Sequence, residues 1–162
     1  MQARPGAAEL VHALRDAGVA TAVATTGTGD WVLPLLDTLF GLDMFDVVVT
    51  GSDIVDLKPS PAVYLEALAR LDVLPSGAVA VEDSANGVQA AVSAGLLCVA
   101  VANSYTRDQD LSGAVAVLDD LTRPGGVCVL SGDPELRHGL SVTALRRLVT
   151  EPSVPGSSGN RG

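Results

Sequence analysis

The stretch VAVEDSANG (residues 79–87) joins a run of small apolar residues to two adjacent carboxylates, Glu82 and Asp83, and then to a small polar turn. Its evenly apolar beginning predicts a strand over residues 78–81 that is buried on both faces, as parallel sheets require. The residues after the turn predict a helix over 86–94. This segment therefore reads as strand, loop and helix, with both carboxylates at the carboxyl end of the strand.

The two carboxylates need an explanation beyond helix capping. Asp83, together with Ser84, can cap the helix that follows, but a cap accounts for only one of the two acids. Adjacent negative charges repel each other unless a cation or a set of hydrogen-bond donors neutralises them. Oxygen ligands at the end of a strand suit Mg²⁺, so Glu82 and Asp83 are candidate magnesium ligands.

The same alternation of apolar runs and amphipathic stretches continues in both directions along the chain. Such an alternation over short loops indicates βαβ crossovers, and it predicts an α/β fold with a doubly wound, Rossmann-like parallel sheet and helices on both faces. The expected strands cover residues 19–24, 47–50, 78–81, 97–101 and 114–118, and the expected helices cover residues 5–17, 30–40, 60–71 and 86–94.

The pattern weakens toward the C-terminus. Residues 127–130 read as a short strand, and residues 140–149 read as either a strand or a helix. We expect a core domain over 1–122, an extension over 123–150 that packs on the core, and a disordered tail over 151–162, where almost no residue can be buried.

Composition excludes several classes of protein. The chain has 162 residues, of which 48% are hydrophobic, which suffices for one domain with a real core. No apolar run is long enough to span a bilayer, and no signal peptide is visible, so we expect a cytoplasmic protein without membrane contact. A net charge of -9 and only 3% aromatic residues argue against nucleic acid as a partner. Cys98 and Cys128 are read as core thiols.

Two other strand ends carry residues that suit phosphate. Thr25 and Thr26 follow the strand over 19–24, where hydroxyls and a helix N-terminus can hold an anion. Lys58, the only lysine, stands in a Lys-Pro-Ser-Pro loop after the next strand. Taken singly, the threonines can be a turn and Lys58 a solvated charge. Since ligands of open α/β sheets bind beyond the carboxyl ends of the strands, the three strand ends together predict a phosphate and magnesium site.

These motifs resemble those of the haloacid dehalogenase-like superfamily, in its β-phosphoglucomutase and phosphoglycolate phosphatase-like branch. The resemblance covers about residues 4–120 and rests on Ala24-Thr25-Thr26, Lys58-Pro59-Ser60-Pro61 and Val81-Glu82-Asp83-Ser84-Ala85-Asn86-Gly87. It implies Mg²⁺-dependent phosphoryl transfer from a small phosphorylated metabolite, by a phosphatase or a sugar-phosphate mutase.

The resemblance also implies a role for each motif residue. Thr25 would hydrogen-bond the transferring phosphoryl group, with Thr26 beside it. Lys58 would act as the catalytic lysine that neutralises phosphate and nucleophile charge. Asp83 would bind Mg²⁺, and Glu82 would bind it directly or support it. The implied partner is the metabolite alone, and the oligomeric state is left open.

One part of the family pattern is missing. Family members begin with a strand that ends in Asp-x-Asp-Gly, whose first aspartate attacks phosphorus, and this sequence contains no such motif. The helical cap that the family inserts after that strand is also absent. The family places the nucleophile strand between the strands that correspond to residues 19–24 and 78–81. We therefore expect an open apolar slot and unpaired strand edges there, and a chain that is inactive alone.

Three interpretations remain open at this point. The chain can be an N-terminally truncated part of a phosphatase or phosphomutase. It can instead be a noncatalytic binding or regulatory module that keeps a phosphate and Mg²⁺ pocket. A nucleotide-binding or receiver-type α/β domain has less support, since no glycine-rich nucleotide loop is present.

Overall fold

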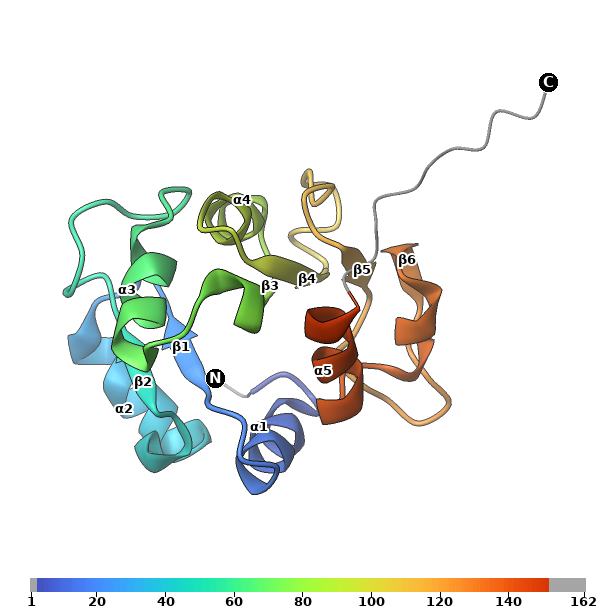
Figure 1. The fold of residues 1–162 in the computed structure, drawn as a ribbon, viewed down its shortest axis with the longest axis horizontal. Helices are drawn as coiled ribbons and strands as arrows, with labels where there is room; N and C mark the ends of the chain where they lie inside the picture. The colour runs from blue at the N-terminus through green and yellow to red at the C-terminus, as the bar shows by residue number, and fades with distance from the viewer. Residues whose placement is uncertain (1–2, 152–162) are drawn as a thin grey trace.

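The structure, a computed structural model, describes residues 3–151 and shows two sheets lying in one layer with helices on both sides (Figure 1). The elements, in chain order, are α1 (Ala7–Asp16), β1 (Ala22–Ala24), α2 (Gly29–Leu39), β2 (Val47–Val49), α3 (Ala62–Leu71), β3 (Val79–Glu82), α4 (Ala85–Ser93), β4 (Leu97–Val101), β5 (Ala116–Leu118), β6 (Val129–Gly132) and α5 (Val142–Thr150), with short 3₁₀ turns at Leu42–Met44, Pro75–Gly77 and Pro134–His138. The predicted α/β class is confirmed.

Strand pairing divides the layer into two parts. β1 pairs in parallel with β2, while β3, β4, β5 and β6 form a second sheet in that order. Within the second sheet only β6 runs antiparallel, against β5. In the described part of the chain, β1 and β3 do not pair with each other. The gap between strands that was expected from the sequence is therefore present.

An apolar slot lies between β1 and β3. It is a cavity of about 670 Å³ whose wall includes residues of both strands and of α1, α3 and α5. Val81, in the middle of β3, lines this slot and is 42% exposed, although it belongs to an apolar strand. The slot is open because, among the described residues, β1 and β3 do not pair and no strand lies between them.

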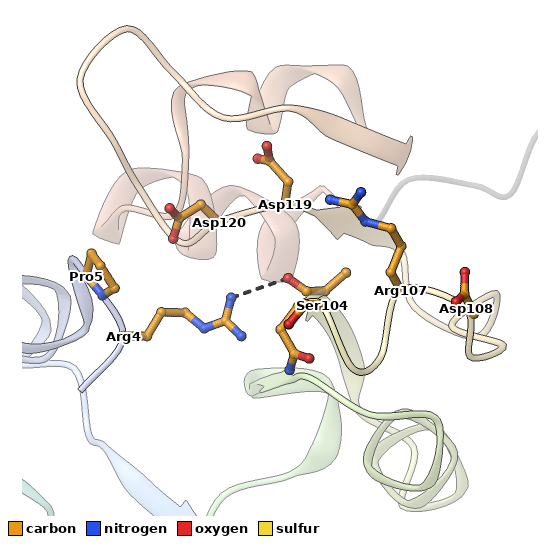
Figure 2. A pocket seen from close by; sticks show the side chains of 9 residues that line it. Arg4, Pro5, Ser104, Arg107, Asp108, Asp119 and Asp120 are labelled. Atoms are coloured by element: carbon orange, nitrogen blue, oxygen red, sulfur yellow. Dashed lines mark hydrogen bonds between the residues drawn. The ribbon is translucent and has the colours of Figure 1, made fainter. Parts of the chain in front are cut away.

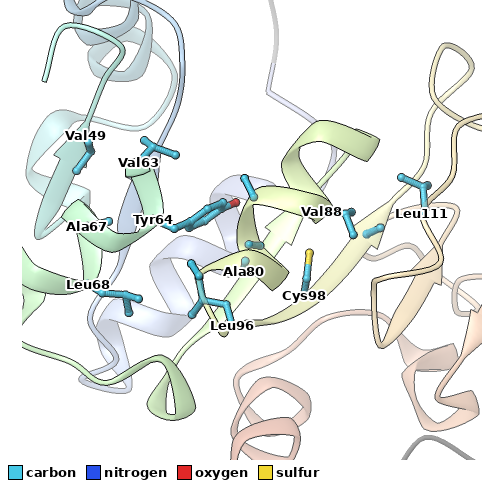
Figure 3. Packing of buried hydrophobic residues seen from close by; sticks show 14 of the residues in the cluster. Val49, Val63, Tyr64, Ala67, Leu68, Ala80, Val88, Leu96, Cys98 and Leu111 are labelled. Atoms are coloured by element: carbon cyan, nitrogen blue, oxygen red, sulfur yellow. The ribbon is translucent and has the colours of Figure 1, made fainter. Parts of the chain in front are cut away.

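The core has two halves, one on each face of the second sheet. Residues alternate along β4, so Cys98 and Ala100 pack with α3 and α4, while Val99 and Val101 pack with β5 and α5. Figure 3 shows the first half, in which Tyr64 extends from α3 toward α4. This two-sided burial explains why the strand sequences are apolar throughout.

Several details differ from the sequence-based expectations. Residues 140–149 belong to a helix, α5, whose N-cap Ser141 accepts a hydrogen bond from the backbone N–H of Ala144. Cys128 is exposed, so the prediction of a core thiol was wrong for it and right for buried Cys98. Cys128 lies in a loop beside Asp119, and its backbone N–H donates to that carboxylate.

The predicted tail over 151–162 falls outside the described residues, apart from Glu151. None of the helices in the described range is long and apolar enough to span a bilayer. The division into a core over 1–122 and an extension over 123–150 stays a prediction, although the core half around Leu136 and Leu148 contacts β4 and β5.

Candidate functional site

The loops after β1, β2 and β3 leave their strands at the carboxyl end. Thr25 comes directly after β1, Thr50 directly after β2 and Asp83 directly after β3. Since β1 pairs in parallel with β2 and β3 in parallel with β4, each loop opens on the edge of its sheet where ligands of this fold class bind.

The first two loops are held together by backbone contacts. The Thr25 N–H donates to the carbonyl of Val49 (3.0 Å), and the Gly51 N–H donates to the carbonyl of Gly27 (2.8 Å). A Cβ atom at Gly51 would lie 2.3 Å from the carbonyl oxygen of Thr26, so only glycine fits this approach. The hydroxyl of Thr25 accepts the Gly27 N–H (3.1 Å). Both threonines are half-buried.

Lys58 and Glu82 form an ion pair between the second and third loops. The Lys58 ammonium donates to Glu82 Oε1, and the two side chains are only 14% and 8% exposed. The hydroxyl of Tyr64, on α3, donates to the same oxygen, and the Lys58 ammonium lies 4.9 Å from the Tyr64 ring centre. A buried carboxylate needs such partners, because desolvation of an unpaired charge is costly.

The pKa values of two neighbours reflect this buried charge. Burial, and then the Glu82 carboxylate, raise the pKa of Tyr64, so its hydroxyl stays protonated and keeps donating. Burial, with a smaller effect of Glu82, raises the pKa of Cys98 to about 12. Cys98 is therefore an unreactive thiol next to the site, because only a thiolate is nucleophilic.

The glycine of the Glu-Asp-Ser-Ala-Asn-Gly motif makes room for the Glu82 carboxylate. A Cβ atom at Gly87 would lie 1.9 Å from Glu82 Oε2. The hydroxyl of Ser84 accepts the Gly87 N–H (3.2 Å) and caps α4, so the expected cap falls on Ser84. The motif thus places Glu82 against the first turn of α4.

Asp83 is exposed at the end of β3 and is the carboxylate that is free to meet a cation. Its Oδ2 accepts a long hydrogen bond (3.4 Å) from the Asn103 amide. In the described range no group of three or more His, Cys, Asp or Glu side chains could hold a metal. Mg²⁺, however, commonly keeps several waters and binds one or two carboxylates plus substrate phosphate. One exposed aspartate beside an amide fits that mode of binding.

The structure joins the sequence-predicted residues only in part. It links Lys58 to Glu82 and places Asp83 next to Glu82. Between residues 3 and 151, no hydrogen bond or ion pair joins Thr25 or Thr26 directly to Lys58. The roles of these five residues stay predictions.

Sequence reasoning missed two residues of this site. Tyr64 lies on the buried face of α3, which also includes Val63, Ala67 and Leu68, whereas the neighbouring apolar Leu65 is 48% exposed. Asn103 follows β4, a strand end that had not been searched for polar side chains. Reading the residues after every predicted strand would have found Asn103, but no local signal shows that Tyr64 reaches Glu82.

Comparison with known proteins identifies related chains. A family model described as haloacid dehalogenase-like hydrolase matches residues 1–95. Protein CbbY of Cereibacter sphaeroides is 42% identical over 130 residues, which make up 78% of this chain and 56% of that protein. Phosphoglycolate phosphatase of Nitrosospira multiformis is 36% identical over 110 residues, or 68% of this chain and 48% of that protein.

A solved structure extends the similarity to the fold. A mutant of CbbY from Rhodobacter sphaeroides, in complex with xylulose-(1,5)bisphosphate, superposes with a TM-score of 0.69 and 43% identity. The match covers 72% of this chain and 53% of that one. The chain therefore spans about half the length of the relatives it matches.

Proposed function

Because the chain belongs to the haloacid dehalogenase-like hydrolases, we propose that it carries the phosphate- and magnesium-binding half of a phosphoryl-transfer site for a small phosphorylated metabolite. The observation that carries the proposal is the buried Lys58–Glu82 pair, held at the carboxyl end of β3 beside the exposed carboxylate of Asp83. An ammonium held by Glu82, with the carboxylate of the next residue, Asp83, exposed, suits a phosphate bridged to a divalent cation.

Each residue has a separate part in this proposal. Thr25 and the backbone of Thr26 bind oxygens of the transferring phosphoryl group. Lys58 neutralises its charge as it forms and breaks bonds, and Glu82 orients Lys58. Asp83 binds the magnesium ion, which supplies charge neutralisation at the phosphate oxygens when bound. Such positioned charges provide most of the catalysis in phosphoryl transfer, because the protein makes few covalent bonds itself.

The nucleophile must come from outside these residues. In the proposed reaction an aspartate attacks phosphorus, the P–O bond to the metabolite breaks, and water or a sugar hydroxyl then takes the phosphoryl group from the aspartate. No Asp-x-Asp-Gly motif is present in the 162 residues. We propose that a strand carrying it occupies the slot between β1 and β3, so the chain alone is inactive. The choice between phosphatase and mutase stays open.

Relatives suggest which metabolites to try. CbbY of Rhodobacter sphaeroides was solved with xylulose-(1,5)bisphosphate, and another relative is a phosphoglycolate phosphatase. We propose that this chain serves a similar substrate, and both molecules carry a second anionic group besides one phosphate. We also keep a cytoplasmic location as part of the proposal.

Binding of inorganic phosphate in the presence of Mg²⁺, measured by titration calorimetry on the 162-residue protein, tests the proposed site. Lys58→Met and Asp83→Asn should each weaken phosphate binding about tenfold or more, since each removes a charged partner. Asp72→Asn is the matched control, because Asp72 is exposed at the end of α3. Equal phosphate affinity in the Lys58, Asp83 and Asp72 variants would contradict the proposed phosphate site.

Turnover of phosphoglycolate, together with the sequence upstream of Met1, distinguishes part of a phosphoryl-transfer enzyme from a noncatalytic binding module. The chain alone should release no phosphate. In-frame translation upstream of Met1 should reveal an Asp-x-Asp-Gly strand. A nearby in-frame stop would favour the module instead. Turnover by the chain that is lost in Asp83→Ala would show that the nucleophile is already present.

A further inference from the structure

A second pocket lies at the carboxyl ends of β4 and β5, apart from the apolar slot. It has a volume of about 440 Å³, and its wall combines the segment before α1 with the loops after β4 and β5. Figure 2 shows Arg4 and Arg107 entering it from opposite sides, with Asp119 and Asp120 between them on a third. Two guanidinium groups from distant parts of the sequence thus face one cavity, which raises the question of what ligand they could bind there.

Both arginines have donors to spare. Arg4 is half-buried, and with residues 3–151 its guanidinium makes one long hydrogen bond (3.4 Å), to the carbonyl of Ala102. The Arg107 guanidinium makes no hydrogen bond or ion pair with any residue from 3 to 151. A guanidinium carries five N–H donors and no acceptor, so most of the donors in this pocket are free for a ligand.

Two of the three carboxylates that line the pocket are already engaged, and the third, Asp108, lies on the side of Arg107 that faces away from Arg4 (Figure 2). Asp119 pairs with Arg123 (2.5 Å) and accepts the Cys128 N–H (2.8 Å). Burial acts to raise the pKa of Asp119, but these two partners bring the pKa below its usual value, so the carboxylate stays ionised and bound to them. Asp120 accepts the backbone N–H of Leu121 (2.8 Å). The unused cationic donors of the pocket are those of Arg4 and Arg107, and such donors bind anionic groups through charge-assisted hydrogen bonds.

Asn103 connects this pocket to the proposed phosphate site. Its amide nitrogen contacts Asp83, and its amide oxygen accepts the N–H groups of Tyr105 (2.8 Å) and Thr106 (3.1 Å). Asn103 itself lines the pocket. The loop that carries Arg107 is thus tied to the carboxylate proposed to bind magnesium. Asn103 thus lies between Asp83 and the pocket.

We propose that Arg4 and Arg107 bind a second anionic group of the substrate, while its transferring phosphate lies at Lys58. This inference rests on the proposed function and narrows the substrate to metabolites with two anionic groups. Guanidinium groups bind phosphate and carboxylate through paired N–H donors, so either group fits the chemistry of the pocket. The two arginines act as specificity residues, and neither takes part in the transfer itself.

Titration calorimetry with Mg²⁺ on the 162-residue protein tests the pocket with two matched pairs of ligands. One pair is xylulose 1,5-bisphosphate and xylulose 5-phosphate, and the other is phosphoglycolate and ethyl phosphate. Arg4→Gln and Arg107→Gln should each weaken binding of the doubly anionic ligand about tenfold and leave its monoanionic partner within about twofold. The pair that responds identifies the second group as a phosphate or a carboxylate.

Two controls separate the possible failures. Arg137→Gln removes a cation from the turn at Pro134–His138 and should change no affinity, because Arg137 does not line the pocket. If both pocket variants bind all four ligands like the unmodified protein, while Lys58→Met weakens all four, the pocket assignment is wrong and the proposed function stands. If Lys58→Met changes none of the affinities, the proposed function is wrong.

Discussion

At the scale of single residues, the site depends on a carboxylate that is buried against a glycine. Glu82 is 9% exposed and is neutralised by Lys58 and Tyr64. Its other oxygen lies where the Cβ of any residue but glycine would be at position 87. The motif glycine is therefore required by close approach and not by an unusual backbone angle.

Gly87→Ala should destabilise the protein by about 2 kcal/mol, because the added methyl group must displace the Glu82 carboxylate from its buried partners. Thermal unfolding followed by circular dichroism measures the change. Gly77→Ala is the control, since a Cβ there would find Val73 Cγ1 at 3.4 Å, an ordinary contact. A Gly87→Ala protein as stable as the control would show that Glu82 is not held in this position.

The pKa of Asp53 predicts that the loop after β2 makes a pH-dependent contribution to the stability of the fold. Hydrogen bonds from the backbone N–H and hydroxyl of Thr50, with a further one from Arg70, lower the pKa of Asp53 to about 2. Because the pKa is lower in the folded protein, the ionised carboxylate stabilises the fold at pH values above the unfolded-state pKa of about 3.9. This stabilisation is lost as the pH falls toward 2.

Asp53→Asn should therefore lower the melting temperature at pH 7 by about 2 °C, a small change because the carboxylate is partly exposed. The difference from the unmodified protein should shrink below about pH 4. Thermal unfolding between pH 7 and pH 3 measures this difference in melting temperature. Asp56→Asn, in the same loop, is the control, because Asp56 is exposed and its carboxylate has no hydrogen bond or ion pair among residues 3–151. An Asp53→Asn difference that stays constant with pH would contradict the pKa assignment.

At the scale of elements, caps and apolar runs made most of the fold predictable. α4 begins after Ser84 and the strand before it ends at Glu82, each within one residue of the expected boundary. The face of α3 was less predictable, because Tyr64 is buried and Leu65 is exposed. Apolar character alone does not say which side of a helix meets the sheet, since contacts with β1 and β2 decide it.

Ser84→Ala should cost about 1 kcal/mol of stability, because it leaves the Gly87 N–H at the start of α4 without its side-chain acceptor. Ser84→Gly is the discriminating variant, since glycine at an N-cap costs only a few tenths of a kcal/mol. Denaturant unfolding of the three proteins measures both. Equal losses in the two variants would mean that the hydroxyl acts through something other than the cap.

At the scale of the whole molecule, the most informative feature is the divided sheet. Neighbouring parallel strands normally satisfy each other's backbone groups, yet β1 and β3 face a common cavity without pairing. The lining of that cavity is largely apolar, with residues of α1 and α5 on one side and of α3 on the other. Such a surface should make the isolated chain prone to self-association.

Val81→Lys should reduce self-association and change the free energy of unfolding by less than about 1 kcal/mol, since Val81 faces the open slot and is already 42% exposed. Val99→Lys is the contrasting variant. Val99 is 0% exposed in β4, so a charge there should prevent folding. Light scattering after size exclusion and urea unfolding provide the two readouts. If Val81→Lys lowers the free energy of unfolding as much as Val99→Lys does, the slot is closed in solution.

The sequence by itself determined the α/β class, the family and the residues at three strand ends, because apolar runs, caps and motif spacing are local properties of the chain. It also predicted that the strands now seen as β1 and β3 would not pair, since the motif of the strand expected between them is not in the sequence. Only the tertiary structure decided that Tyr64 holds Glu82, that Asn103 reaches Asp83 and that Arg4 faces Arg107 across one pocket. These residues are between 18 and 103 positions apart in the chain, and their proximity depends on how the sheet and helices pack.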